Sequence, residues 1–197
     1  IDLRALDSRQ LQSLTTSQIS WLSESQISSL ETWQVAALST LQIRSLLSGQ
    51  IRALTDGQLV AMTTAQYASL KTEQVAALST SQVQSIETRD LLSLNTLQIS
   101  ALTSGQVSAF KTSQLLALST GQITALEFED VAALSTSQVR ALRTAQIAAI
   151  ETSDLLALDV AQLQALDTAQ IRALTSRQLA ALPAGAGNVA SYSTVTL

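Results

Sequence analysis

The chain repeats one eight-residue pattern without insertion or deletion over residues 2–182, and this period constrains its fold more than any other feature. Two consecutive copies are Thr136–Leu142 (TSQVRAL) and Thr144–Ile150 (TAQIAAI). We number each octad from its conserved polar residue. Position one is Gln in nineteen copies and Asp in four, position two is apolar, position four is Ala or Ser except Trp21, and position five is mostly Leu. So strict a period predicts a repeat array whose units bury a shared core.

The spacing of the apolar positions favours short helices. Positions two and five are three residues apart, which places them on one face of a helix and does not fit the alternation of a half-buried strand. A single continuous helix is excluded, because eight residues advance about 80° beyond two full turns and the apolar stripe would circle the helix. The sequence therefore predicts one helix of roughly one and a half to two turns per octad, with a bend between copies.

An isolated helix of this length is unstable in water, so each octad must stack on its neighbours. The expected fold class is therefore all-α: a solenoid of very short helices with a continuous core and a β-prone C-terminal tail. The Ser or Thr at position seven is the expected helix N-cap. Position six is the alternative, because pairs such as Ser39 and Gln42 also read as a capping box.

The Gln and Asp residues at position one are expected to be structural. Short helices leave many backbone groups unpaired, and Gln can both donate and accept. We expect this column to bond the backbone of neighbouring bends, with the acceptor facing helix N-terminal amides. Its candidate residues are Gln82, Asp90, Gln98, Gln106, Gln114, Gln122, Asp130, Gln138, Gln146 and Asp154.

Three octads carry two acidic residues together: Glu87 with Asp90, Glu127 with Asp130, and Glu151 with Asp154. Carboxylates at helix N-termini are favoured by the backbone dipole, which is the simpler reading. A calcium site is the alternative, but it needs more oxygens than two residues supply. We therefore expect no metal and no cofactor.

Composition excludes several functions. The chain has no His and no Cys, its glycines are scattered singly, and no Ser has an activating partner at a readable spacing, so an enzyme is not expected. The net charge is −4 without a basic stripe, which argues against nucleic-acid binding. No apolar run is long enough to span a membrane. Only 13% of residues are charged, a composition found in secreted fibrous proteins.

The array is expected to be one domain over residues 1–182. Pro183–Asn188 reads as a hinge, and Val189–Leu197 as a β-prone tail or the start of a following segment. The opening octad, Ile1–Leu6, begins in mid-repeat, which suggests a fragment of something longer. Large residues at unusual positions, Trp21, Trp33 and Leu41, and Tyr192 in the tail, are candidates for self-association, although local core filling is the alternative for the first three.

The sequence pattern at Leu78–Ile86 and Leu134–Leu142 resembles three known groups. The first two are the short-helix superhelices of mesothelin and stereocilin and the first helix of TAL-effector repeats. The third is the octapeptide arrays of large bacterial secreted or surface proteins, often labelled adhesins or haem-utilisation proteins. The unbroken array looks closest to the last group. TAL repeats carry a base-reading loop that is absent here, so DNA reading is not implied. No functional residue transfers from any of the three.

The resemblance and the composition together favour a structural protein: an extracellular stalk, fibre or filament on a bacterial surface. Its expected partners are copies of itself or further segments of a longer chain. The first alternative is a solenoid that binds a surface protein or glycan, since position three varies freely. The second is adsorption to ice or another surface through a row of Thr at position seven, which requires those hydroxyls to face solvent.

Overall fold

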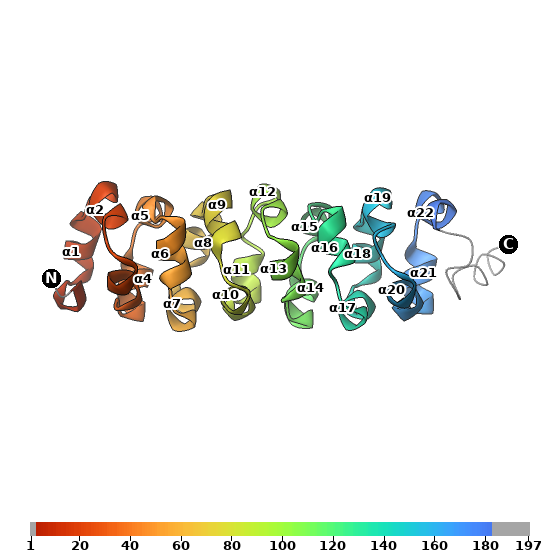
Figure 1. The fold of residues 1–197 in the computed structure, drawn as a ribbon, viewed down its shortest axis with the longest axis horizontal. Coiled ribbons are helices and arrows are strands. Elements are labelled where there is room, and N and C mark those ends of the chain that lie inside the picture. Colours follow the sequence, from red (N-terminus) through yellow and green to blue (C-terminus); the bar gives the residue numbers. More distant parts are fainter. Residues whose placement is uncertain (1–2, 183–197) are drawn as a thin grey trace. The chain divides into compact units, whose positions relative to one another are not determined.

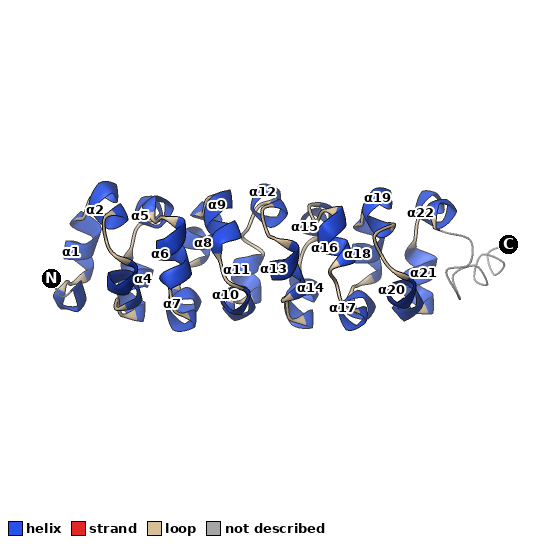
Figure 2. Cartoon of the chain, in the orientation of Figure 1, coloured by secondary structure: helices blue, strands red, loops and turns tan. Residues whose placement is uncertain are grey.

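The computed structural model describes residues 3–182 and confirms the all-α solenoid (Figures 1 and 2). The chain forms two compact units, residues 1–102 and 103–197. The expected hinge and β-prone tail lie outside the described residues. One short helix forms in each octad of the described part, and no strand occurs there.

The first unit contains a 3-10 helix, η1 (Leu3–Ala5), and twelve α-helices within its described residues. Their bounds are α1 Ser8–Ser13, α2 Thr16–Ser20, α3 Glu24–Ser28, α4 Thr32–Ala37, α5 Thr40–Ser45, α6 Ser48–Ala53, α7 Asp56–Ala61, α8 Thr64–Ser69, α9 Thr72–Ala77, α10 Thr80–Ser85, α11 Thr88–Leu91 and α12 Thr96–Ser100.

The described part of the second unit contains ten α-helices of the same kind. Their bounds are α13 Ser104–Ser108, α14 Thr112–Ala117, α15 Thr120–Thr124, α16 Phe128–Ala132, α17 Thr136–Ala141, α18 Thr144–Ala149, α19 Thr152–Leu155, α20 Val160–Ala165, α21 Thr168–Ala173 and α22 Ser176–Ala181.

Within each unit, every helix packs on the helix three places further along the chain. In the first unit α1 packs on α4, α2 on α5 and α3 on α6, and the second unit continues the rule with α16 on α19 and α17 on α20. Three octads, or 24 residues, therefore make one turn of the solenoid. Because each turn holds a whole number of octads, every turn presents the same octad positions to the next, which is why the same residue type recurs at each position.

The core of each unit consists of positions two and five, as the apolar spacing predicts. Val35, Leu38, Leu115 and Leu118 illustrate it, with at most 4% of each side chain exposed. Position three points outward in most octads, and Arg140 is one of its exposed members. Burial of two aliphatic side chains per octad contributes roughly 3–6 kcal/mol, which is the main stabilising contribution to each short helix.

The structure corrects the expected N-cap. The cap lies at position six, not position seven: the side chains of Ser39 and Ser135 accept from the backbone N–H of the Gln three residues later. Position seven is already the first helical residue. The capping box explains the choice, because a Gln at the third helical position can reach back only to a cap three residues before it.

Two consecutive extended residues make each bend. Leu142 at position five has ψ 139° and leaves the helix, and a position-six residue such as Ser135, at ψ 159°, then caps the next one. The position-five N–H donates to the position-two carbonyl, as from Leu142 to Val139 over 3.2 Å. None of the described helices is long and apolar enough to cross a bilayer.

Candidate functional site

The most distinctive polar feature of the fold is the buried column of Gln side chains at position one. Each amide oxygen accepts from the N–H of its own helix N-cap, as Gln138 does from Ser135 over 2.7 Å and Gln50 does from Leu47 over 2.7 Å. The second example matters because a Leu side chain cannot cap a helix. The Gln oxygen therefore accepts from the N-cap N–H even where the N-cap residue at position six has an apolar or basic side chain.

The amide nitrogen of the same side chain reaches a different turn of the solenoid. Gln42 donates to the carbonyl oxygens of Leu11 and Leu14, each over 2.8 Å, and Gln146 donates to those of Leu115 and Leu118, also over 2.8 Å. These carbonyls lie 31 and 28 residues earlier, at positions two and five of the octad four places back. Both carbonyls lie at the end of that helix: the position-five carbonyl has no helical partner of its own, and the position-two carbonyl also accepts from the position-five N–H.

Each Gln of this kind therefore joins the start of one helix to the end of another on the preceding turn. The bonds within the described units link Gln34, Gln42, Gln50, Gln58, Gln66, Gln74, Gln82, Gln98, Gln138, Gln146, Gln162, Gln170 and Gln178 to earlier carbonyls. These side chains are at most 5% exposed. Loss of one would leave several buried polar groups unpaired, at about 1–3 kcal/mol each.

The remaining Gln residues named from the sequence occupy equivalent places. Gln106, Gln114 and Gln122 are buried, and each accepts from its own N-cap N–H, over 2.7 Å from Thr103, 2.9 Å from Lys111 and 3.0 Å from Ser119.

Asp90 departs from the column in a specific way. Its side chain is fully buried, and Oδ1 accepts from the Thr64 hydroxyl over 2.8 Å. Oδ2 has no hydrogen-bond partner and lies 3.5 Å from Nε of Arg89. The same Nε lies 3.0 Å from Oε2 of Glu87. The N-cap residue of α11, Glu87, makes no side-chain cap hydrogen bond, and the Asp90 carboxylate does not accept from the Glu87 N–H.

Tyr67 supplies the donor that Asp90 lacks. A Gln at residue 90 would reach the Leu59 carbonyl by the 31-residue spacing, and the Tyr67 hydroxyl donates to that carbonyl instead, over 2.9 Å. Tyr67 is fully buried. Burial, followed by the negative charges of Asp90 and Glu87, raises the pKa of the Tyr67 hydroxyl, so it remains a protonated donor. In the sequence, the only sign of this replacement is that Tyr67 is the one aromatic residue at position two.

The other two Asp residues behave differently from Asp90. Asp130, 4% exposed, accepts from the Glu127 N–H over 3.1 Å and so keeps the capping half of the Gln role. Its burial, and after it the charges of Glu127, Glu129 and Asp154, raise its pKa to about 6. Asp154 is half-buried, accepts from the Ser153 hydroxyl over 3.1 Å and does not cap α19. No group of three or more metal-ligating side chains occurs among the described residues.

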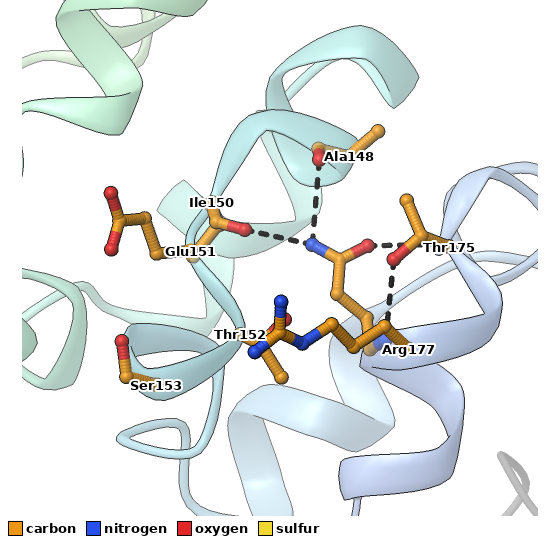
Figure 3. Close-up of a pocket in the computed structure, with 8 residues that line it drawn as sticks. Ala148, Ile150, Glu151, Thr152, Ser153, Thr175 and Arg177 are labelled. Atoms are coloured by element: carbon orange, nitrogen blue, oxygen red, sulfur yellow. Dashed lines mark hydrogen bonds between the residues drawn. The ribbon is translucent and has the colours of Figure 1, made fainter.

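A pocket of about 430 Å³ in the second unit is lined in part by Gln178, one member of the column. Figure 3 draws the residues that line it. Its lining residues are Ala148, Ile150, Glu151, Thr152, Ser153, Thr175, Arg177 and Gln178. Gln178 donates to the Ile150 carbonyl over 2.8 Å and accepts from the Thr175 N–H over 2.8 Å, so its polar atoms are engaged within the fold. The pocket lies at the contact between α19 and α22.

The candidates for self-association lie on the surface of the first unit. Trp21 follows α2 and is 79% exposed, Trp33 in α4 is 48% exposed, and Leu41 in α5 is 68% exposed. Local core filling is therefore wrong for these three side chains. Tyr192 lies outside the described residues. Trp21 also lines a cavity of about 320 Å³ with leucines of the first octads.

A family of repeat proteins matches this chain in tandem, in agreement with the repeated octads of the fold. The ALTTAQ repeat model matches six times in tandem, at residues 1–32, 27–64, 57–85, 83–120, 123–150 and 147–183. These matches cover nearly all of the octad array. No curated protein matches the chain.

Proposed function

Because this chain belongs to the ALTTAQ repeat family, we propose that it is a structural repeat protein, serving as part of a stalk, fibre or filament on a bacterial cell surface. The single observation that carries this proposal is the Gln column. It ties each helix start to a helix end on the preceding turn through buried hydrogen bonds, as Gln42 does for Leu11 and Leu14. Such cross-turn bonds suit a spacer that must keep its turns together.

The polar groups of the fold support a scaffold better than an enzyme. Each buried Gln side chain that donates to earlier carbonyls makes three or four hydrogen bonds, all of them with backbone groups, as Gln42 and Gln50 do. Among residues 3–182, Oδ2 of Asp90 is the one buried side-chain oxygen without a hydrogen bond, and Asp90 is 0% exposed, so this oxygen does not line an open cleft. Catalysis by general acid and base would also have to operate without any His.

Surface labelling tests the proposed location. Antibodies raised against residues 3–182 should label intact, unpermeabilised cells of the source organism, and protease added outside those cells should remove the label. Labelling only after permeabilisation would refute an extracellular stalk. A matched antibody to a cytoplasmic protein controls for lysis.

A binding solenoid is the competing proposal, and the exposed position-three side chains support it. Arg140, Arg52 and Gln84 are exposed members of that varied position. A glycan array and a panel of purified surface proteins separate the two ideas. Saturable binding that is lost on Arg140→Ala or Arg52→Ala would favour a binding module.

A Thr row is the third proposal, and the N-cap correction favours it. Capping falls to position six, and the position-seven residues Thr16, Thr40 and Thr88, on α2, α5 and α11, are exposed. Thr64 on α8 is exposed too, but its hydroxyl donates to Asp90. These helices stack on one another in the first unit. Thermal hysteresis measured on purified protein tests adsorption to ice, and its absence would remove this function.

A further inference from the structure

We infer that a buried water molecule lies beside Asp90, bound between the Glu87 N–H, the Met62 carbonyl oxygen and Oδ2 of Asp90. The site lies within the first unit. It goes beyond the proposed stalk, because it depends on the interior of the fold and not on what the array meets at its surface. The water completes the replacement of one Gln that Tyr67 and Asp90 make only in part.

An ordinary octad of the same unit shows which backbone groups meet at position one. Oε1 of Gln82 accepts from the Ser79 N–H over 2.8 Å. Its Nε2 donates to the carbonyls of Ile51 and Leu54 over 3.1 and 2.6 Å. A single carboxamide is therefore within hydrogen-bond distance of an N-cap N–H and of two carbonyls, 31 and 28 residues earlier.

By the same spacings, the groups around Asp90 are the Glu87 N–H and the carbonyls of Leu59 and Met62. The Tyr67 hydroxyl donates to the Leu59 carbonyl over 2.9 Å, so that carbonyl has its donor. The Glu87 N–H and the Met62 carbonyl have no hydrogen-bond partner among residues 3–182. One donor and one acceptor of the backbone are therefore left at this place.

The carboxylate of Asp90 does not reach either group. Its Oδ1 accepts from the Thr64 hydroxyl over 2.8 Å, and its Oδ2 has no hydrogen-bond partner. Asp is one methylene shorter than Gln, so the carboxylate ends about 1.5 Å nearer to its own backbone than a Gln carboxamide does. Met62 and Asp90 are 1% and 0% exposed, so bulk solvent does not reach the Met62 carbonyl or Oδ2.

The backbone of the N-cap keeps its usual conformation in spite of the missing Gln. Glu87 has φ −70° and ψ 149°, close to the −73° and 162° of Ser79 one octad earlier. The Glu87 N–H therefore has the direction in which the Ser79 N–H meets the oxygen of Gln82. Two acceptors and one donor surround the space that a Gln carboxamide fills in the ordinary octads.

A water molecule matches these three groups. It donates to Oδ2 and to the Met62 carbonyl and accepts from the Glu87 N–H, which gives the roughly three hydrogen bonds typical of a buried water. A cation would bind the two oxygens, but it would be repelled by the N–H dipole and by Arg89, whose Nε lies 3.5 Å from Oδ2. The water connects the start of α11 to the end of α7, as a Gln at position one does in other octads.

Crystal structures of the unsubstituted protein, Asp90→Gln and Asp90→Asn test the site, at a resolution that shows ordered water. The unsubstituted protein should have a peak within hydrogen-bond distance of all three groups. In Asp90→Gln the carboxamide should take the place of the water and the peak should vanish. Asp90→Asn is the matched control, because Asn is as short as Asp, so the peak should remain. No peak in the unsubstituted protein, or a peak that persists in Asp90→Gln, would overturn the proposal.

Crystals soaked in rubidium chloride separate water from a cation. A cation site would show the anomalous signal of rubidium and would be lost in Asp90→Asn, which lacks the negative charge. A water site shows no such signal and is kept in that variant. Rubidium at the site would therefore overturn the water and assign a cation in its place.

Transfer of magnetisation from water to amide protons, measured by NMR, tests the site in solution. A long-lived water should give the Glu87 amide proton a cross-peak at the water frequency in the unsubstituted protein and in Asp90→Asn, and none in Asp90→Gln. The Ser79 amide, which Gln82 already holds, is the internal control and should give none in any of them. A Glu87 cross-peak of equal strength in Asp90→Gln would trace it to surface solvent and refute the buried water.

Discussion

The hydroxyl of Tyr67 and the carboxylate of Asp90 together replace one Gln. Tyr67 donates to the Leu59 carbonyl that a Gln at residue 90 would serve, and Asp90 accepts from Thr64 in place of the N-cap amide. The two residues are 23 positions apart and belong to adjacent turns, since α8 packs on α11. A substitution at one therefore changes what is tolerated at the other.

Tyr67→Phe should destabilise the protein by about 1–2 kcal/mol, because the Leu59 carbonyl loses a buried donor while the ring stays in place. Tyr67→Ile should cost more, because it also leaves a cavity. The double variant Tyr67→Ile with Asp90→Gln restores the ordinary octad pair. It should recover much of the loss, with a coupling of about 1–3 kcal/mol in denaturant melts. Additive effects of the two changes would show that the residues are independent.

Gln138→Leu should destabilise the second unit by roughly 2–4 kcal/mol, because the Ser135 N–H and the carbonyls of Ser108 and Phe110 all lose a partner. Gln138→Asp should cost less, since Asp130 shows that a carboxylate at this position can hold the N-cap N–H. Gln10→Leu is the matched control, because Gln10 is exposed and donates to no earlier carbonyl. The opposite order of Leu and Asp in urea melts would refute the capping role.

Core and surface positions should differ sharply in their tolerance. Leu118→Ala and Leu134→Ala remove side chains that are 0% and 3% exposed, and each should cost about 2–5 kcal/mol. Arg140→Ala, at the exposed position three, should change stability by less than about 0.5 kcal/mol. Thermal and chemical melts of the three variants measure this. Equal losses at both kinds of position would mean that the inner face has been misassigned.

The stability of the second unit should depend on the protonation of Asp130. Its pKa is raised from 3.8 to about 6 in the folded state. Between these values the unfolded chain gives up the proton and the folded protein keeps it, so this group's contribution to stability falls as pH rises from about 4 to above 6. Below 4 both states are protonated and the contribution is constant.

Asp130→Asn removes that titration and keeps an oxygen for the Glu127 N–H. The variant should match the unsubstituted protein near pH 4 and exceed it by roughly 1–2 kcal/mol at pH 7. Urea melts across this range measure the difference. Glu129→Gln removes one of the charges that raise the pKa and should give a smaller gain. A difference that does not vary with pH would show that Asp130 does not titrate in this window.

Gly121→Ala should stabilise α15 by roughly 0.5–1 kcal/mol, because Ala loses less backbone entropy in a helix. A Cβ at this residue meets no atom within 4 Å. At Gly49 a Cβ would lie 2.2 Å from Oε1 of Glu24, so Gly49→Ala is the matched comparison, and its gain should be smaller because Glu24 must move. Melting temperatures of the two variants test the ranking.

The octad pattern by itself determined the helical class, the length of the helices, the inner face and the polar column. Each of these depends on spacings within eight residues, as between Val139 and Leu142 in the core, and local periodicity carries that information. The choice between positions six and seven for the N-cap was local too, yet the sequence left it open because Ser and Thr occupy both, as at Ser135 and Thr136.

Only the tertiary structure decided how many octads make a turn. The sequence pattern would allow positions two and five to be buried equally well with three octads per turn or with another small number. The partner of each Gln followed from that number: the carbonyls of Leu115 and Leu118 become neighbours of Gln146 because three octads complete the turn. The pairing of Tyr67 with Asp90 has the same origin. A contact between residues 23 positions apart depends on the angle at every intervening bend, and that angle is set by side-chain packing between turns, which no single octad encodes.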